Sequence, residues 1–303
     1  MERRPWTRWL WLGLPGFAEV ALALGARSTR LTPTHADWDS VLAVVDAELA
    51  PGDVIWVHPT WSAAPWAELE AIALNKGLAR GNVFLHADPV TEADVARFRR
   101  VWLLQRTGDA PPQPLRGAVE PRHAGGRLQV HVATVAVGAV ATDFLGTLEK
   151  AQVERMEPDG GRGAPCRWSG DRQRCEGPFW KDVRVQWTEV GNTRRRCVFA
   201  QPHPDRGTLR IRFPAVPLGT RLVGGVGLNL WANRYEEGSD VRFGIAVDGA
   251  TVYETQLPRQ DFTWHTVDVP TTPGAHEVVV SLSADDARWR QACFDLVALE
   301  AAP

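Results

Sequence analysis

The stretch Val241-Arg-Phe-Gly-Ile-Ala-Val-Asp-Gly-Ala-Thr-Val-Tyr-Glu-Thr-Gln256 decides the fold of the C-terminal half of this chain. It predicts a β-hairpin, because an Asp-Gly turn at Asp248-Gly249 matches the twist of two antiparallel strands. Six further segments have the same character. The eight candidate strands are Arg196–Ala200, Leu209–Phe213, Leu222–Trp231, Val241–Val247, Thr251–Gln256, Thr263–Val269, Glu277–Leu282 and Ala292–Leu299. Eight short strands spaced by turns predict an antiparallel jelly-roll β-sandwich over residues 166–303.

The first half of the chain alternates helical and strand patterns instead. Helices are expected from Asp37 to Leu49, from Pro65 to Leu78 and from Thr91 to Arg100. The apolar runs between and after them predict strands that are buried on both faces, as in a parallel sheet. These strands are Val54–Val57, Val83–Leu85 and Val101–Leu104. We therefore expect a small Rossmann-like parallel-sheet α/β lobe over residues 27–140, to which residues 128–137 add a strand.

Two flanking segments complete the expected domain order. Residues 141–165 should form a helix, Thr142–Met156, followed by a linker. Residues 1–26 begin with positive charge and continue with a short apolar run, which is the order of an export signal. A residual membrane helix, an amphipathic surface helix and a buried helix are the alternatives. Membrane association through residues 6–26 is therefore one expectation, and cleavage of the segment is left open.

The charge balance argues against a general nucleic-acid binder. The 303 residues include 34 Lys and Arg against 36 Asp and Glu, which gives a net charge of −2. A protein that neutralises phosphates needs a basic excess. The sequence also contains neither a phosphate-binding glycine loop nor a dinucleotide fingerprint.

The four cysteines, Cys166, Cys175, Cys197 and Cys293, all lie in the second half. They form no Cys-x-x-Cys pair, so zinc is not expected. Two disulfides in an oxidising, extracytoplasmic compartment fit better. We favour Cys166–Cys175, which closes a short loop, and Cys197–Cys293, which ties the first strand of the sandwich to its last. Four free buried thiols are the alternative.

The most ligand-like cluster lies in a loop between two strands and consists of Trp231, Asn233, Arg234, Tyr235 and Glu236. A sugar is held by an aromatic plate against its apolar face and by polar groups on its hydroxyls, and this cluster supplies both. A similar loop spans Asp285–Arg290. The alternative is a sandwich-edge loop with a core tryptophan. Either acidic loop could hold a structural Ca²⁺, and no other cofactor is expected.

A second candidate site lies in the first half. His58 with Trp61, and His86 with Asp88, directly follow expected parallel strands. Ligands bind at that edge of open α/β sheets, and histidine beside a carboxylate suits acid–base chemistry or metal binding. The alternative, which we favour, is that they are loop residues capping the next helices. No nucleophile accompanies them, so no catalytic residue is assigned.

Two resemblances to known families rest on short motifs. The first half is similar to the soluble extracytoplasmic region of bacterial GT-C membrane glycosyltransferases of the protein-mannosyltransferase type. This likeness rests on Asp37-Trp-Asp39, Ala50-Pro-Gly-Asp-Val-Ile-Trp-Val-His-Pro59 and Val101-Trp-Leu-Leu104. The membrane domain that carries catalysis in that family has no counterpart here. The second half resembles a galactose-binding-like or carbohydrate-binding-module jelly roll, through Val241–Gly249, Trp264–Val269, Pro273-Gly274 and Cys293–Val297.

These resemblances imply a non-catalytic accessory protein of the periplasm or cell surface with a carbohydrate-binding sandwich. Its partner would be a glycan or glycoconjugate, and its setting an envelope glycan or glycosyltransferase system. Two alternatives stay open. One is an enzyme, a hydrolase or transferase, with its site at the His58/His86 edge. The other is a protein–protein interaction domain that binds no sugar. The sequence leaves the oligomeric state undetermined.

Overall fold

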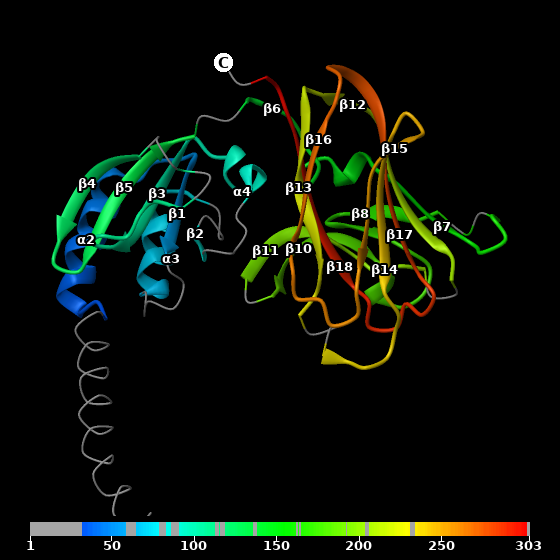
Figure 1. Ribbon diagram of the computed structural model, residues 1–303, viewed down its shortest axis with the longest axis horizontal. Helices are drawn as coiled ribbons and strands as arrows, with labels where there is room; N and C mark the ends of the chain where they lie inside the picture. Colours follow the sequence, from blue (N-terminus) through cyan, green and yellow to red (C-terminus); the bar gives the residue numbers. More distant parts are fainter. Residues whose placement is uncertain are drawn as a thin grey trace, which may run out of the picture.

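An α/β lobe and a β-sandwich lie side by side in the computed structural model, with one short helix between them (Figure 1). The residues it describes are 32–58, 65–78, 83–85, 91–112, 115, 119–135, 138–161, 163, 165–191, 193–203, 206–230 and 234–301. The expected N-terminal signal or membrane segment, residues 1–26, lies outside them. No helix among the described residues combines the length and the apolar character needed to span a membrane.

The α/β lobe is built on a five-stranded sheet in the order β2-β1-β3-β5-β4. Its elements are α2 (His35–Glu48), β1 (Asp53–His58), α3 (Trp66–Asn75), β2 (Val83–Leu85), α4 (Glu92–Ala96), β3 (Arg100–Arg106), β4 (Val119–Gly125) and β5 (Leu128–Thr134). β1 pairs in parallel with β2 and β3, as expected. β5 pairs antiparallel with β3 and β4, so the sheet is mixed rather than purely parallel.

Strand β4 is not among the expected strands, because residues 107–126 contain several prolines, which disfavour a strand. β4 is the last strand of its sheet, and a proline such as Pro121 is tolerated on an edge strand. The expected start of the first helix is also corrected. Thr34, not Asp37, is the N-cap, and Asp37 is its partner in the capping box. The third expected helix, Thr91–Arg100, is shorter than expected: α4 ends at Ala96, and Thr91 and Asp94 form a capping box at its start.

The expected helix Thr142–Met156 is wrong. The structure has β6 (Val140–Asp143), a single 3₁₀ turn η1 (Leu148–Lys150) and β7 (Gln152–Met156) there. Phe144 and Leu148 do recur at helical spacing, but both are buried in the core of the sandwich. β6 pairs with β18 (Ala292–Leu299) and β7 pairs with β12 (Thr208–Leu218), so hydrogen bonding to these strands outweighs the helical periodicity.

The β-sandwich is confirmed. One sheet has the order β16-β13-β18-β11-β10-β9-β8, with β6 also paired to β18, and the other has the order β15-β14-β17-β12-β7. Each of the eight expected segments contains a strand. The elements after β7 are β8 (Arg167–Ser169), β9 (Arg172–Arg174), η2 (Phe179–Lys181), β10 (Val183–Val190), β11 (Thr193–Ala200), β12 (Thr208–Leu218), β13 (Arg221–Leu228), β14 (Val241–Val247), β15 (Ala250–Leu257), β16 (His265–Pro270), β17 (Gly274–Ala284) and β18 (Ala292–Leu299).

The core lies between the two sheets and is filled by alternate residues of each strand. In β17, Val278, Val280 and Leu282 are fully buried, as their spacing requires. Phe243 of β14 packs against Phe294 of β18 at 5.8 Å between ring centroids, which connects the two sheets. The strand pairing thus places the apolar side chains in one continuous layer between the sheets, and the polar loops lie at the ends of the sandwich.

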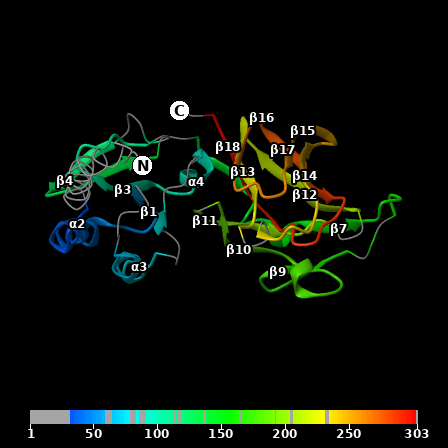
Figure 2. The same cartoon turned by 60° about the horizontal axis from the view of Figure 1, so that its bottom comes forward.

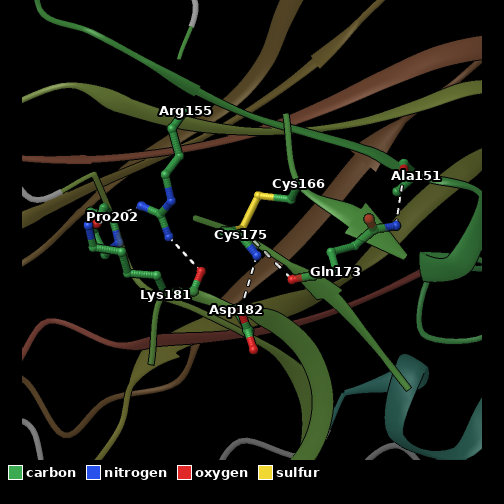
Figure 3. Close-up of a disulfide and its surroundings, with 8 residues drawn as sticks. All are labelled: Ala151, Arg155, Cys166, Gln173, Cys175, Lys181, Asp182 and Pro202. Atoms are coloured by element: carbon green, nitrogen blue, oxygen red, sulfur yellow. Dashed lines mark hydrogen bonds between the residues drawn. A yellow bond between two sulfur atoms is a disulfide. The ribbon is translucent and has the colours of Figure 1, made fainter. Parts of the chain in front are cut away.

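Both disulfides that we favoured from the sequence are present, and they indicate folding in an oxidising compartment. Cys166–Cys175 closes the base of the β8–β9 hairpin (Figure 3). Cys197–Cys293 joins the neighbouring strands β11 and β18. The first bond is further supported by the backbone N–H of Cys175, which donates to Asp182.

Helix α4 connects the two lobes. Its Ala93 packs against Val223, Val297 and Leu299 on the outer face of the larger sheet of the sandwich. Arg97, directly after the helix, donates to Asp295 at 2.9 Å and also bonds Asp143. Burial raises the pKa of Asp295, and the positive charge of Arg97 opposes that shift. A paired buried charge of this kind fixes the orientation of one lobe on the other.

Candidate functional site

Three loops meet at one end of the sandwich. They connect β13 to β14, β15 to β16, and β17 to β18, and the first and third are seen together at the lower end of the sandwich in Figure 1. The cluster 231–236, which the sequence analysis identified, lies in the first of these loops. The similar loop Asp285–Arg290 is the third. The antiparallel strand order therefore brings the two candidate loops to the same place.

Two exposed aromatic rings from these loops stack on each other. The ring centroids of Tyr235 and Trp289 are 4.3 Å apart, and the ring planes differ by 17°. The residues are 45% and 46% exposed, although rings of this size usually avoid water. We call this pair the aromatic platform. Two other members of the sequence-predicted cluster, Trp231 and Asn233, lie outside the described residues, and Arg234 and Glu236 lie beside the platform and are exposed.

A buried arginine holds the platform from beneath. Arg290 is fully buried, and its guanidinium donates to the carbonyl of Ser239 at 3.0 Å. It also donates to the carbonyls of Glu237 and Tyr235. Burial lowers the pKa of Arg290, because the low-polarity surroundings disfavour its charge. The residue after Trp289 thus ties one loop to the backbone of the other.

The backbone of the platform loops is itself constrained. Trp289 has φ of 57°, in the left-handed region that side chains rarely adopt. Gly238 has φ of +91°, and a Cβ there would lie 2.4 Å from the carbonyl oxygen of Arg288, so only glycine fits. Next to it, Arg288 donates to Asp286 from two nitrogens and lowers the pKa of that carboxyl to about 2.

A groove with a volume of about 420 Å³ adjoins the loops. It is lined by Gly238, Ser239, Asp240, Arg242, Gln256, Arg259 and Asp285. Asp240 accepts from the amide of Gln256 at 2.6 Å and from the backbone N–H of Arg259 at 2.8 Å. Arg242 and Asp285 form an ion pair at 3.2 Å, and both are mostly exposed. The polar groups of the groove are therefore held by their neighbours before any ligand arrives.

Sequence reasoning missed most of this groove. Arg242 and Gln256 lie directly opposite each other across β14 and β15. They belong to the hairpin from which the fold was predicted, but neither was identified as a candidate ligand-binding residue. The available signal was their position at the open end of the hairpin, beside the loop that carries Tyr235.

The chemistry of the groove and platform suits the binding of a ligand. Fixed donors and acceptors beside an exposed aromatic surface match a polyhydroxylated ligand with one apolar face. In the described part of the chain, no group of three or more His, Cys, Asp or Glu side chains is placed to hold a metal ion. The structural Ca²⁺ suggested from the sequence therefore stays a prediction.

The second candidate site is only partly visible. His58 ends β1 at the carboxyl edge of the parallel strands and is half-buried. Burial lowers its pKa, and the charge of Asp109 works in the opposite direction. Trp61, His86 and Asp88 lie outside the described residues. The proposed His58/His86 edge therefore stays a prediction from the sequence.

Comparisons with known proteins found distant likenesses only. No family model and no curated protein matches the chain. A CBM51 module of a Clostridium perfringens GH95 protein, solved with methyl-galactose, is 12% identical with a TM-score of 0.25, over 48% of this chain and 86% of that one. Tandem CBM51 modules of a Streptococcus pneumoniae family 98 glycoside hydrolase are 13% identical with a TM-score of 0.33, over 58% and 57%. A family 35 carbohydrate-binding module from an environmental isolate is 17% identical with a TM-score of 0.23, over 35% and 80%. Likenesses this distant establish neither a family nor a ligand for this chain.

Proposed function

We propose that the β-sandwich binds carbohydrate, with the aromatic platform under the sugar ring and the adjoining groove around its hydroxyls. The observation that carries the proposal is the stacked pair Tyr235–Trp289, which is half-exposed and faces solvent beside fixed polar groups. Aromatic rings offer a large, rigid surface to the C–H face of a sugar at little entropic cost. Asp240, Arg242 and Gln256 supply a carboxylate, a guanidinium and an amide nearby.

Two energetically unfavourable features of the platform, a buried charge and a strained backbone, support a binding role. Burying the charge of a residue such as Arg290 is unfavourable in free energy unless its N–H groups make hydrogen bonds. Here they donate to backbone carbonyls of the platform loop. The left-handed backbone of Trp289 adds strain of about 1–3 kcal/mol. Strained backbone of this kind is often kept where a surface must have one shape. A loop with no ligand would gain stability by relaxing both features.

The wider setting is part of the same proposal. The protein would act outside the cytosol as a non-catalytic accessory in envelope glycan or glycosyltransferase systems, with membrane association through residues 6–26. Two disulfides support the oxidising compartment. Cell fractionation of the full-length protein, and of a variant without residues 1–26, tests the membrane part. Recovery of both forms in the soluble periplasmic fraction would contradict it.

The sugar-binding proposal is tested on a glycan array with the intact protein and a Trp289→Ala variant. Loss of the stacked ring should weaken binding to any recognised glycan roughly tenfold or more, about 1.4 kcal/mol. Leu74→Ala is the control, because Leu74 is an apolar side chain exposed to a similar extent, 51%, and lies on α3 of the other lobe. Equal binding by the Trp289 variant, or no glycan bound by the intact protein, would contradict the proposal.

A further inference from the structure

Four arginines line the outer face of the β8–β10 edge of the larger sheet. Arg167 of β8 lies directly opposite Arg174 of β9, and Arg172 of β9 lies directly opposite Arg184 of β10. Arg172 and Arg174 are two residues apart on one strand, so both pairs project from the same face. The opposite face holds buried Gln173 and Val183. We call the four arginines the arginine face.

The opposed arginines destabilise the folded protein when no ligand is bound. Opposed like charges are unfavourable across a pair of strands, because their Cβ atoms lie only about 5 Å apart. Arg167 and Arg174 are exposed, and neither makes an ion pair with another described residue. The charge of Arg172 also helps to lower the pKa of Arg184, although burial contributes more to that shift. Asp171 and Asp182 pair with Arg172 and also act on the charge of Arg184, so the opposed pair Arg167–Arg174 is the one that they leave uncompensated.

Covalent and hydrogen-bonded supports hold the arginine face in spite of this repulsion. The disulfide Cys166–Cys175 clamps the base of the β8–β9 hairpin (Figure 3). On the inner side, the amide of Gln173 donates to the carbonyls of Leu148 and Ala151, both at 2.9 Å. The hairpin and the neighbouring strand β10 thus present two pairs of like charges on a rigid frame.

Two exposed aromatic rings flank the arginine face. Phe179 and Trp180 in η2 are 66% and 45% exposed and lie edge to face, with centroids 5.5 Å apart. The guanidinium of Arg184 donates to the carbonyl of Phe179 at 3.1 Å, so η2 adjoins the arginines. Buried Arg155 donates to the carbonyl of Lys181 at 2.6 Å and fixes the turn from the other side. Guanidinium groups and aromatic rings therefore share one rigid surface.

We propose that the arginine face, with Phe179 and Trp180, is a second binding surface that takes an acidic polysaccharide bearing regularly spaced sulfate or carboxylate groups. Arginine binds such groups through two parallel hydrogen bonds, and neighbouring guanidiniums match charges that repeat along a chain. Bound anions would also remove the repulsion between the opposed pairs. The exposed rings offer stacking surface for the sugar units between the charges.

The arginine face is distinct from the groove and the aromatic platform. The strands that line the groove belong to the other sheet, whereas β8 and β9 lie beyond β10 at the edge of the larger one (Figure 2). An anionic membrane is the competing partner. A regular row of arginines on a sheet favours a ligand of matching geometry, whereas membrane attraction depends on the number of cations near the surface.

The test compares the intact protein with Arg167→Gln/Arg174→Gln in titrations against heparin and polygalacturonate, with neutral dextran as the blank. The double variant should bind at least one of the acidic polymers about tenfold or more weakly, and its melting temperature should stay equal or rise by about 1–3 °C as the repulsion is removed. Arg196→Gln/Arg210→Gln removes the same charge at exposed positions outside the arginine face and should keep the affinity.

Three results would overturn the proposal. One is that neither acidic polymer binds the intact protein. Another is that the control variant loses as much affinity as the arginine-face variant, which would make the attraction a matter of net charge. The third is that the intact protein binds phosphatidylserine vesicles but no acidic polymer, which would assign the surface to membranes. None of these results bears on the Trp289 site, so the two proposals stand or fall separately.

Discussion

The loops that carry the aromatic platform and the β8–β10 edge that carries the arginine face are both surface elements with an unfavourable feature. In the platform loops it is a strained tryptophan backbone over a buried arginine, and at the β8–β10 edge it is two pairs of opposed arginines. The platform loops are held by hydrogen bonds from Arg290, while the hairpin is held by the disulfide Cys166–Cys175. The comparison teaches that each proposed binding surface has its own support, so each should fail separately.

Removal of the buried support should have the largest effect. Arg290→Met keeps much of the side-chain volume but leaves the carbonyls of Ser239, Glu237 and Tyr235 without their donor. Buried acceptors without a partner cost about 1–3 kcal/mol each, so we expect unfolding free energy to fall by about 3 kcal/mol or more. Urea denaturation measures this loss, and faster hydrogen exchange at residues 235–240 would locate it.

Arg288→Met is the matched control, because Arg288 is two positions away with a side chain that is 68% exposed. It should cost less than about 1 kcal/mol. Equal losses in the two variants would contradict the role assigned to Arg290.

Removal of the disulfide under the arginine face should have the next largest effect. In Cys166→Ser/Cys175→Ser the short loop loses its closure, which we expect to cost about 2–3 kcal/mol. Hydrogen exchange should accelerate in residues 167–174 and stay unchanged in the platform loops. Acceleration at both places would contradict the independence of the two supports.

The smallest effect concerns pH at the platform. The pKa of Asp286 is lowered to about 2 by hydrogen bonds from Arg288, so its ionised form favours the folded state. That contribution is complete above an unfolded pKa of about 4 and disappears as the pH falls from about 4 through about 2. The melting temperature of the intact protein should therefore exceed that of Asp286→Asn at pH 6, and the difference should vanish near pH 2. A constant difference across this range would contradict the assignment.

Strand periodicity predicted much of the sandwich, and pairing with strands distant in the sequence explains where it failed. The eight expected strands rest on alternation and turn residues that act over a few positions. The segment Thr142–Met156 was misassigned because Phe144 and Leu148 match a helical spacing, yet both are needed in a core built by distant strands. β10 was overlooked although Val183 and Val185 alternate with polar residues and both face the core.

The sequence identifies the two loops of the candidate site, but it does not show that they form one surface. Tyr235 and Trp289 were each identified beside charged residues, and only the order of β13, β14, β17 and β18 brings them into contact. The groove depends on an even finer detail. The register between β14 and β15 shifts at Ile245/Ala246, which places Gln256 rather than Thr255 opposite Arg242. A one-residue bulge of this kind leaves no clear signal in a single sequence.

The most direct test of the central claim is a calorimetric titration of the glycan selected on the array into the intact protein and into Tyr235→Ala/Trp289→Ala. The account predicts measurable binding to the intact protein and a loss of about tenfold or more in the double variant, with the melting temperature changed by only a few degrees. An unchanged dissociation constant in a folded double variant would contradict it, because the aromatic platform would then not be where the sugar binds.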